Sequence, residues 1–263
     1  MRNLQVIGGG KMGEALLGGL LASGWTEPAG LRVVEPVAGR RDELAARFPG
    51  VAVSADLGPG ADHLIAVKPG EVADVCAALA RNRGVRRVLS VAAGVTTAKL
   101  EAALGPDVAV VRAMPNTPAL IGQGAAAIAG GTRATSDDLD WAESVLAAVG
   151  VVARVDESQI DAVTGLSGSG PAYVFLVAEA MIEAGVLVGL SRPVAQKLAV
   201  QTLLGSAALL QSSDRSAADR RADVTSPGGT TAAGLRALEQ GGVRAAFLDA
   251  IAAATARSAE LGR

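Results

Sequence analysis

A glycine-rich segment near the start of the chain has the residue types and spacing that bind a phosphate. Residues 8–13 read Gly-Gly-Gly-Lys-Met-Gly, which fits the pattern G-x-G-x-x-G and follows an apolar run. In such a motif Gly8 makes the tight turn, Gly10 lets the backbone approach a pyrophosphate, and Gly13 lets a helix pack closely on the strand. The rival phosphate loop, G-x-x-x-x-G-K-[ST], is excluded because Met12 stands where Ser or Thr is required. The motif predicts dinucleotide binding at a helix N-terminus.

Charged residues behind this motif bear on the choice of dinucleotide. Glu35 ends the second apolar run, ~20 residues on, where the fingerprint expects an acidic residue. A carboxylate there accepts a hydrogen bond from a ribose 2′-hydroxyl and repels a 2′-phosphate, which favours NADH. Arg40 and Arg41 follow closely and could clamp that phosphate, which favours NADPH. The sequence leaves both cofactors open.

The second half of the chain offers few groups for proton transfer. From Asp156 onward there is no His and no Cys, and Lys197 and Tyr173 are its only Lys and Tyr. A hydroxy-acid dehydrogenase needs a base such as His or Lys, so oxidation of a 3-hydroxy acid through Lys197 is one alternative. Val177 removes the Tyr-x-x-x-Lys arrangement. His63, the only histidine, opens an apolar strand and is expected to be a strand-edge residue rather than a catalytic one.

Hydroxyls and backbone amides gather instead at the start of a predicted helix. Residues 224–231 read Val-Thr-Ser-Pro-Gly-Gly-Thr-Thr. The glycines leave N–H groups open to a carboxylate, and a threonine can cap the helix. Such a site suits a substrate that already carries its proton, for example a cyclic imine that arrives as an iminium. Hydride transfer to that cation needs positioning and a hydrogen bond rather than a strong acid.

The first half must supply the elements that position these residues. Apolar runs typical of buried parallel strands alternate with helical segments, which predicts a doubly wound sheet. The strands are expected at 4–8, 31–35, 51–53, 63–67, 88–91, 108–112 and 125–129. The helices between them are expected at 12–23, 38–47, 71–80, 97–103 and 137–148.

The second half reads as helical throughout. Helices are expected at 159–190, 193–210, 231–240 and 243–261, with Pro193 in a first turn after Ser191 as cap. The fold class is therefore α/β: a Rossmann-type dinucleotide-binding domain over residues 1–155, followed by an all-α domain over residues 156–263. Its Ala-rich, apolar helices are expected to pack against another subunit.

Bulk composition narrows the class of protein. The chain has 263 residues, half of them hydrophobic, and a formal net charge of −2, so nothing favours nucleic-acid binding. The single cysteine, Cys76, excludes an internal disulfide and a cysteine zinc cluster. The most apolar stretch, 172–190, is interrupted by Glu179 and Glu183, so we expect a buried helix rather than a membrane span. Without a signal sequence, we expect a cytoplasmic protein.

Taken together, the motifs resemble those of the pyrroline-5-carboxylate reductase family, over essentially the whole chain. The segments that carry this resemblance are 7–13, 66–69, 91–94, 112–118, 161–173 and 223–239. The last is the most specific, and it contains Ser-Pro-Gly-Gly-Thr-Thr over residues 226–231. The resemblance implies an oxidoreductase that reduces 1-pyrroline-5-carboxylate to L-proline, the last step of proline biosynthesis, with NADPH or NADH. Many members carry a small polar residue at the position of Glu35, so their preference does not transfer.

The resemblance also implies roles for individual residues. Gly8, Gly10, Lys11 and Met12 would hold the pyrophosphate, and the residues that lie along the cofactor would be Val67, Lys68, Pro69, Ala92 and Asn116. The substrate would contact Ser226, Gly228, Gly229, Thr230 and Thr231, and Thr231 would act in catalysis as the hydroxyl near the imine nitrogen. The family's helical domain is an interlocked homodimer, often assembled into a decamer. A non-catalytic NAD(P)-binding sensor remains a third alternative, although it leaves residues 226–231 without a purpose.

Overall fold

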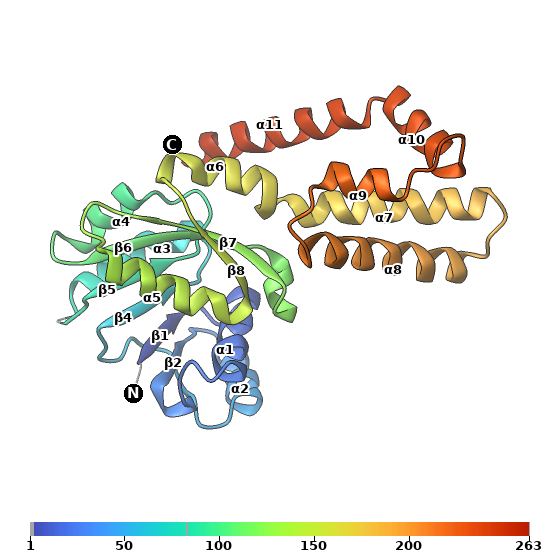
Figure 1. Ribbon diagram of the computed structural model, residues 1–263. Helices are drawn as coiled ribbons and strands as arrows, with labels where there is room; N and C mark the ends of the chain where they lie inside the picture. Colours follow the sequence, from blue (N-terminus) through green and yellow to red (C-terminus); the bar gives the residue numbers. More distant parts are fainter. Residues whose placement is uncertain (1–2, 83, 263) are drawn as a thin grey trace. The chain divides into compact units, whose positions relative to one another are not determined.

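The computed structural model describes residues 3–82 and 84–262. Its first part is an eight-stranded sheet in the order β3-β2-β1-β4-β5-β6-β7-β8. The strands are β1 (Leu4–Ile7), β2 (Leu31–Val34), β3 (Ala52–Ser54), β4 (Asp62–Ile65), β5 (Arg87–Ser90), β6 (Ala109–Met114), β7 (Gly124–Gly130) and β8 (Gly150–Arg154). Neighbouring strands are parallel except β6 and β7, which pair antiparallel. The predicted α/β doubly wound class is confirmed (Figure 1).

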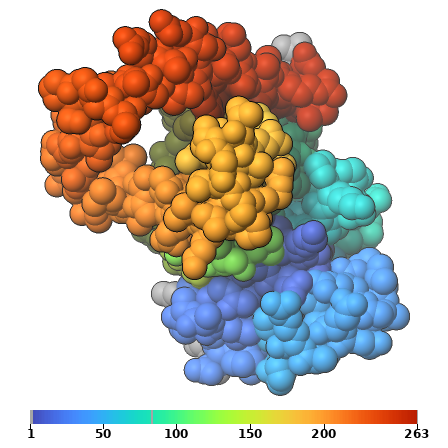
Figure 2. All heavy atoms as spheres, turned by 90° about the vertical axis from the view of Figure 1, so that its right-hand side faces the viewer, coloured from blue at the N-terminus to red at the C-terminus, as the bar shows by residue number. Residues whose placement is uncertain are grey.

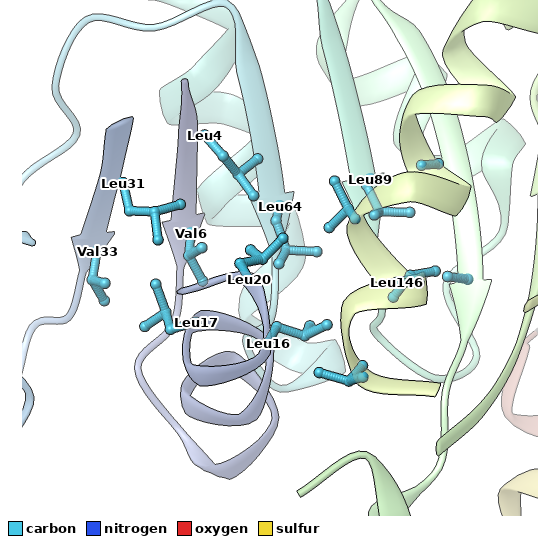
Figure 3. Packing of buried hydrophobic residues seen from close by; sticks show 14 of the residues in the cluster. Leu4, Val6, Leu16, Leu17, Leu20, Leu31, Val33, Leu64, Leu89 and Leu146 are labelled. Carbon is cyan, nitrogen blue, oxygen red and sulfur yellow. The ribbon is translucent and has the colours of Figure 1, made fainter. Parts of the chain in front are cut away.

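Helices link most of these strands and cover both faces of the sheet. They are α1 (Lys11–Ala22), α2 (Ala38–Arg47), α3 (Val72–Ala80), α4 (Thr97–Leu104) and α5 (Ser136–Leu146). Side chains alternate between the faces along each strand: Val6 packs with Leu16 of α1, and Ile7 packs with the cluster that holds Leu79 of α3. Figure 3 shows the first of these layers, where α1 directs its leucines at β1, β2 and β4. Two covered faces explain why the strands read as continuous apolar runs.

Two features of the sheet were not expected from the sequence. β8 extends the sheet beyond β7 as a largely exposed edge strand. The antiparallel pairing of β6 with β7 follows from the short connection between them, because a parallel crossover needs a dozen or more residues. That connection ends in a short 3-10 segment over Thr117–Ile121 and lies between Met114 and Gly124. The expectation of parallel strands throughout was therefore wrong at this one pair.

After β8 the chain is helical. The elements are α6 (Ile160–Val163), a π-helical turn over Thr164–Gly168, α7 (Gly170–Leu187), α8 (Arg192–Gln211), α9 (Ala217–Asp223), α10 (Thr230–Gln240) and α11 (Val243–Gly262). The predicted helices are present, and Pro193 lies in the first turn of α8 with Ser191 at the cap position. The short α9 was missed. Its capping box pairs Ser216 with Asp219, which is a recognisable helix start.

The chain divides into two compact units. The first contains residues 1–169 together with 252–263, and the second contains residues 170–251. The last residues return to the first unit, where Ser258 donates to Asp161 at 2.7 Å and the Lys99 ammonium donates to the carbonyl of Gly262 at 2.6 Å. The helix α11 thus begins in one unit and ends in the other.

The helices of the second unit expose much of their apolar surface. No residue of α7 is buried, and the exposed fraction is 64% for Phe175 and 87% for Leu187. Figure 2 shows an opening among these helices. The expectation that 172–190 is a buried helix is therefore wrong for a single chain. By length and composition alone, Glu157–Leu187 could cross a membrane, and no residue of its apolar 18-residue window is buried.

His63 is a structural residue of the sheet. It lies fully buried in β4, a central strand, so its predicted place at a strand edge was wrong. Its Nε2 donates to the carbonyl of Gly60 at 3.1 Å, which leaves Nδ1 to accept from the Gln5 amide at 3.1 Å. Burial lowers the pKa of His63, although the Gly60 carbonyl and the Asp62 carboxylate oppose the shift. The imidazole is therefore held neutral.

This neutral imidazole predicts a loss of stability in acid. The folded pKa of His63 lies below the unfolded value of about 6.5. Its contribution to the stability of the fold is therefore fully present above pH ~6.5 and is lost as the pH falls through the lower, folded pKa. The free energy of unfolding, measured with urea, is expected to decrease more from pH 7 to pH 5 in the parent protein than in His63→Gln, whose side chain cannot titrate. An equal decrease in both proteins would contradict this assignment.

Candidate functional site

The candidate nucleotide site lies at the carboxyl edge of the parallel strands. The glycine segment follows β1, Glu35 follows β2, Val67 follows β4, Ala92 follows β5 and Asn116 follows β6. Parallel strands bring these loops to one edge of the sheet. The strand order reverses direction at β1, between β2 and β4, which is where such sheets bind nucleotides. The residues predicted to contact the cofactor are thus gathered within the first unit.

The three fingerprint glycines differ in why they must be glycine. Gly8 has a φ of +104°, and a Cβ there would stand 2.6 Å from the carbonyl oxygen of Ala66. A Cβ on Gly13 would collide with the carbonyl oxygen of Gly8. Gly10 has an ordinary φ of −68°, and no atom of the protein lies within 4 Å of the place its Cβ would take. Nothing in the chain's own packing requires glycine at residue 10.

The N-terminus of α1 is open toward the same space. Gly10 is its cap residue and offers no side-chain hydrogen bond, so the first N–H groups of the helix lack an intrahelical partner. Lys11 is exposed and Met12 is half-buried at this end. An uncapped helix start beside an unfilled glycine position fits a pyrophosphate, since it offers N–H donors and the positive end of the helix dipole.

Glu35 is occupied by the protein's own backbone. It is 8% exposed, and its two carboxylate oxygens accept from the N–H groups of Gly9 and Val37, each at 3.0 Å. Arg41 donates to the carbonyl oxygens of Glu35 and Pro36 at 3.0 and 2.7 Å. Each carboxylate oxygen retains lone pairs that could accept from a ribose. The negative charge thus lies just after β2, with Arg41 beside it.

Arg40 adds contacts that the sequence did not indicate. Its Nε donates to the carbonyl of Gly9 at 2.8 Å, and its guanidinium pairs with Glu14 of α1 and Glu43 of α2. The glycine segment is therefore held from both sides, by Glu35 at its N–H and by Arg40 at its carbonyl. Glu43 is a local partner three residues on in α2, but Gly9 and Glu14 lie 31 and 26 residues before Arg40, so no local pattern could have shown those two contacts.

The loops after β4 and β5 complete the edge. The Val67 side chain packs against Gly8, where a Cβ would stand 2.9 Å from Val67 Cγ1. Lys68 and Pro69 follow, both exposed at the start of a 3-10 turn. Ala92 is buried just beyond β5, and its N–H points to the Ser90 hydroxyl at 3.4 Å.

Asn116 links two distant segments of the first unit. Its amide nitrogen donates to the carbonyl of Ser167 at 3.0 Å, and its amide oxygen accepts from the N–H of Ala125 at 2.9 Å. Ser167 belongs to the π-helical turn, and Met114 packs against Gly168 in the same turn. π-Helical turns are rare and often occur at functional sites. Asn116 thus fixes this turn to the nucleotide edge, a contact without a sequence signal.

The predicted substrate loop lies in the second unit. Gly229 is the cap residue of α10, so Thr230 and Thr231 are its first two residues. The expectation that a threonine caps this helix was wrong. Gly228 has a φ of +71°, and a Cβ on Gly229 would collide with the Ser226 hydroxyl oxygen. Ser226 and Thr230 are exposed, while Thr231 is half-buried. The first turn of α10 presents N–H groups and two threonine hydroxyls.

Lys197, the alternative catalytic base, has no neighbouring group that would orient it for proton transfer, within the residues that the structure describes. Lys197 lies on α8 with an exposed side chain. Within residues 3–82 and 84–262, it makes no hydrogen bond or ion pair that would orient it as a base. Among the same described residues, no group of three or more His, Cys, Asp or Glu could hold a metal ion.

Comparison with known proteins places the chain in a family. Residues 157–261 match the model described as pyrroline-5-carboxylate reductase dimerisation, and residues 3–94 match NADP oxidoreductase coenzyme F420-dependent. A pyrroline-5-carboxylate reductase from Synechocystis sp. is 46% identical over 99% of this chain and 98% of its own.

Solved structures agree with the sequence match. A pyrroline-5-carboxylate reductase from Coxiella burnetii is 37% identical, with a TM-score of 0.93, and covers 100% of this chain and 99% of its own. A pyrroline carboxylate reductase from Plasmodium falciparum, with NADP bound, is 28% identical with a TM-score of 0.85, over 100% and 98%. With matches of this identity along its whole length, the chain belongs to the pyrroline-5-carboxylate reductase family.

Proposed function

We propose that this chain reduces 1-pyrroline-5-carboxylate to L-proline with NAD(P)H, the last step of proline biosynthesis. The observation that carries the proposal is the pairing, in one chain, of an open helix N-terminus at a Rossmann edge with a second half that matches the reductase dimerisation model. The matches to proteins named for this activity cover both halves of the chain. The function follows from this pairing rather than from the fold alone.

The nucleotide edge would bind and orient the cofactor. Gly8, Gly10 and Gly13 shape the backbone around the pyrophosphate, and Lys11 and Met12 supply N–H groups of the first turn of α1. The other residues proposed to contact it are Glu35, Val67, Lys68, Pro69, Ala92 and Asn116. When bound, the reduced nicotinamide supplies the hydride. Asn116 contributes by fixing backbone, because both ends of its amide already bond to the protein.

The loop before α10 would bind the imine. N–H groups at Gly228 and Thr230 suit the substrate carboxylate, and the Ser226 hydroxyl lies beside them. The N–H of Gly229 donates to the carbonyl of Ser226 at 3.1 Å, so Gly229 would contribute by shaping the loop. The Thr231 hydroxyl would hydrogen-bond at the ring nitrogen, which keeps the iminium carbon oriented while it accepts the hydride. The iminium already carries the proton that remains on the product nitrogen, so the step needs no general acid. This fits a second half without His or Cys.

A steady-state assay tests the proposal. Pyrroline-5-carboxylate with NADPH, and separately with NADH, should give proline and oxidised cofactor in equal amounts. Oxidation of a 3-hydroxy acid that is lost in Lys197→Ala would instead support the alternative dehydrogenase. Tight cofactor binding without turnover of any imine would support the NAD(P) sensor. Either result would overturn the proposed reduction.

Cofactor preference should respond to Glu35. Removing the carboxylate in Glu35→Ser is expected to raise the ratio of kcat/KM for NADPH to that for NADH about tenfold, because a charge that repels a 2′-phosphate is lost. The ratio is the informative quantity, since Glu35 also holds Gly9 and Val37 and its loss weakens both cofactors. Asp42→Ser, which removes an exposed carboxylate of α2, is the control. An unchanged ratio would show that Glu35 does not face the ribose.

We also propose that the protein is a homodimer, with a decamer of five dimers as the larger assembly. The support is the exposed apolar surface of α7 and α8 and the dimerisation model that covers residues 157–261. Light scattering at micromolar concentration should give at least twice the mass of one 26.2 kDa chain. A mass of one chain would contradict the proposed homodimer.

The same surface bears on location and domain organisation. We propose that a second copy of the chain, rather than lipid, covers Glu157–Leu187, and that the protein is cytoplasmic and binds no nucleic acid, as its net charge of −2 favours. Recovery in the membrane pellet after lysis would contradict this location.

We further propose that the nucleotide domain ends at Val155 and the substrate domain begins at Asp156, directly after β8.

A further inference from the structure

A cavity of about 750 Å³ opens in the first unit at the edge of the sheet opposite the glycine motif. It is lined by the amino ends of strands: Leu4 begins β1, Leu31 begins β2, Asp62 begins β4 and Arg87 begins β5. The glycine motif follows the carboxyl end of β1, so this cavity is not part of the nucleotide edge. Its volume is within the range of small-molecule sites.

Among the described residues that line the cavity, Arg32 is a cation whose charge is not balanced. Arg86 and Arg87 both pair with Asp62, at 3.0 and 2.8 Å, and the other lining carboxylate, Asp140, pairs with Arg154. Arg32 is half-buried in the lining and, within residues 3–82 and 84–262, makes no hydrogen bond or ion pair. Gly58 provides room for it, because a Cβ there would stand 2.7 Å from Arg32 Cζ. The guanidinium therefore retains its donors for an oxyanion.

Two indole rings form part of the same wall. Trp25 and Trp141 line the cavity, and they are the only tryptophans of the chain. Trp25 donates to the Ser144 hydroxyl at 3.0 Å, and Arg87 stacks on Trp141 with its guanidinium carbon 4.3 Å from the ring centroid. Trp141 Nε1 and Arg87 Nε are buried without a hydrogen-bond partner. Aromatic surface beside unused N–H donors favours a ligand with a flat body and an acceptor oxygen.

We propose that this cavity binds a small organic anion, with a carboxylate or phosphate on Arg32 and a planar or apolar body against the indoles. The Asp62 carboxylate would stay paired with Arg86 and Arg87, so Arg32 would form the ion pair with the ligand. The site lies at the opposite edge of the sheet from the residues proposed to bind the cofactor. Binding there is therefore independent of the proposed reductase activity and can be measured without substrate or nucleotide.

Intrinsic fluorescence reads this site directly, because both tryptophans of the chain line it. The purified oligomer, excited at the red edge of indole absorption, is titrated with phenyl phosphate, benzoate and inorganic phosphate. The expected result is a saturable change with phenyl phosphate or benzoate, and the stronger of the two identifies the preferred oxyanion. Inorganic phosphate, which lacks the ring, should bind at least about tenfold more weakly, because it leaves the indoles uncovered.

Three variants make the test specific. Arg32→Gln should weaken binding about tenfold or more through loss of a charge-assisted bond, and Arg32→Lys should fall between it and the parent. Arg133→Gln, which removes an exposed arginine outside the cavity, should bind as the parent does. Arg32→Gln should also keep the circular dichroism and reductase rate of the parent. No saturable change with any probe, or equal affinity in the parent and Arg32→Gln, would overturn the proposal.

Discussion

Gly10→Val is expected to lower the affinity for NADPH and NADH by about 100-fold or more while the protein stays folded. The fold should tolerate valine because no protein atom lies within 4 Å of a Cβ at this position and the backbone is extended. The branched side chain would instead fill the space in front of the N-terminus of α1. Loss of two charge-assisted N–H bonds to a phosphate, each about 1.5–3 kcal/mol, gives a decrease of this size.

Cofactor fluorescence measures the affinity, and circular dichroism with thermal unfolding measures the fold. Gly13→Ala is the comparison variant, because a Cβ there collides with the carbonyl of Gly8 inside the protein. It should lower the melting temperature as well as the affinity, whereas Gly10→Val should lower the affinity alone. Parent-like cofactor binding by Gly10→Val would remove the glycine segment from the nucleotide site.

Thr231→Ala is expected to lower kcat/KM for pyrroline-5-carboxylate by about 10- to 100-fold. Loss of one hydrogen bond at a buried site costs about 1–3 kcal/mol, and each ~1.4 kcal/mol is a factor of ten in rate. Thr231 is the second residue of α10, and Gly229 holds the cap position. The hydroxyl therefore does not cap the helix in this structure, and its loss should leave the melting temperature nearly unchanged.

Two further variants separate catalysis from structure. Thr231→Ser keeps the hydroxyl and should retain most of the parent activity. Thr225→Ala removes a neighbouring hydroxyl that donates to the carbonyl of Arg221 at 2.6 Å, and it should affect stability rather than turnover. If Thr231→Ala unfolds early yet reduces the imine at the parent rate, the residue is structural and the catalytic assignment is wrong.

The layered part of the fold was predictable because its signals are local. Runs such as 4–7 and 31–34 are apolar on both faces, and each lies beside a helical segment. β8 was missed because it is an edge strand with mostly exposed residues, so Gly150–Arg154 carries no strong pattern. The antiparallel pairing of β6 and β7 could have been inferred from their short connection. The π-helical turn at Thr164–Gly168 accepts a hydrogen bond from Asn116, a contact that no local pattern indicates.

The candidate site shows the same division between local and distant causes. The glycine spacing predicted the nucleotide edge because its causes are local or lie in the ligand. Gly8 has a positive φ, Gly13 packs against Gly8, and Gly10 leaves space for a ligand. The sequence could not show that Glu35 and Arg40 already bond to Gly9, because these partners meet only when β1, β2 and α2 pack together. The sequence also did not indicate the cavity around Arg32, whose lining comes from five strands, their flanking loops and α5.

The path of α11 has a consequence for how the protein is made. Its last turns belong to the first unit, where Leu261 lies against Gly94, and Ser258 and Gly262 bond to residues more than ninety positions earlier. The first unit is therefore completed by a segment that leaves the ribosome only after all of residues 170–251 have been synthesised. A nascent chain that stalls before residue 252 would carry strands β1 to β8 of the sheet but would lack the last turns of α11, which complete the first unit.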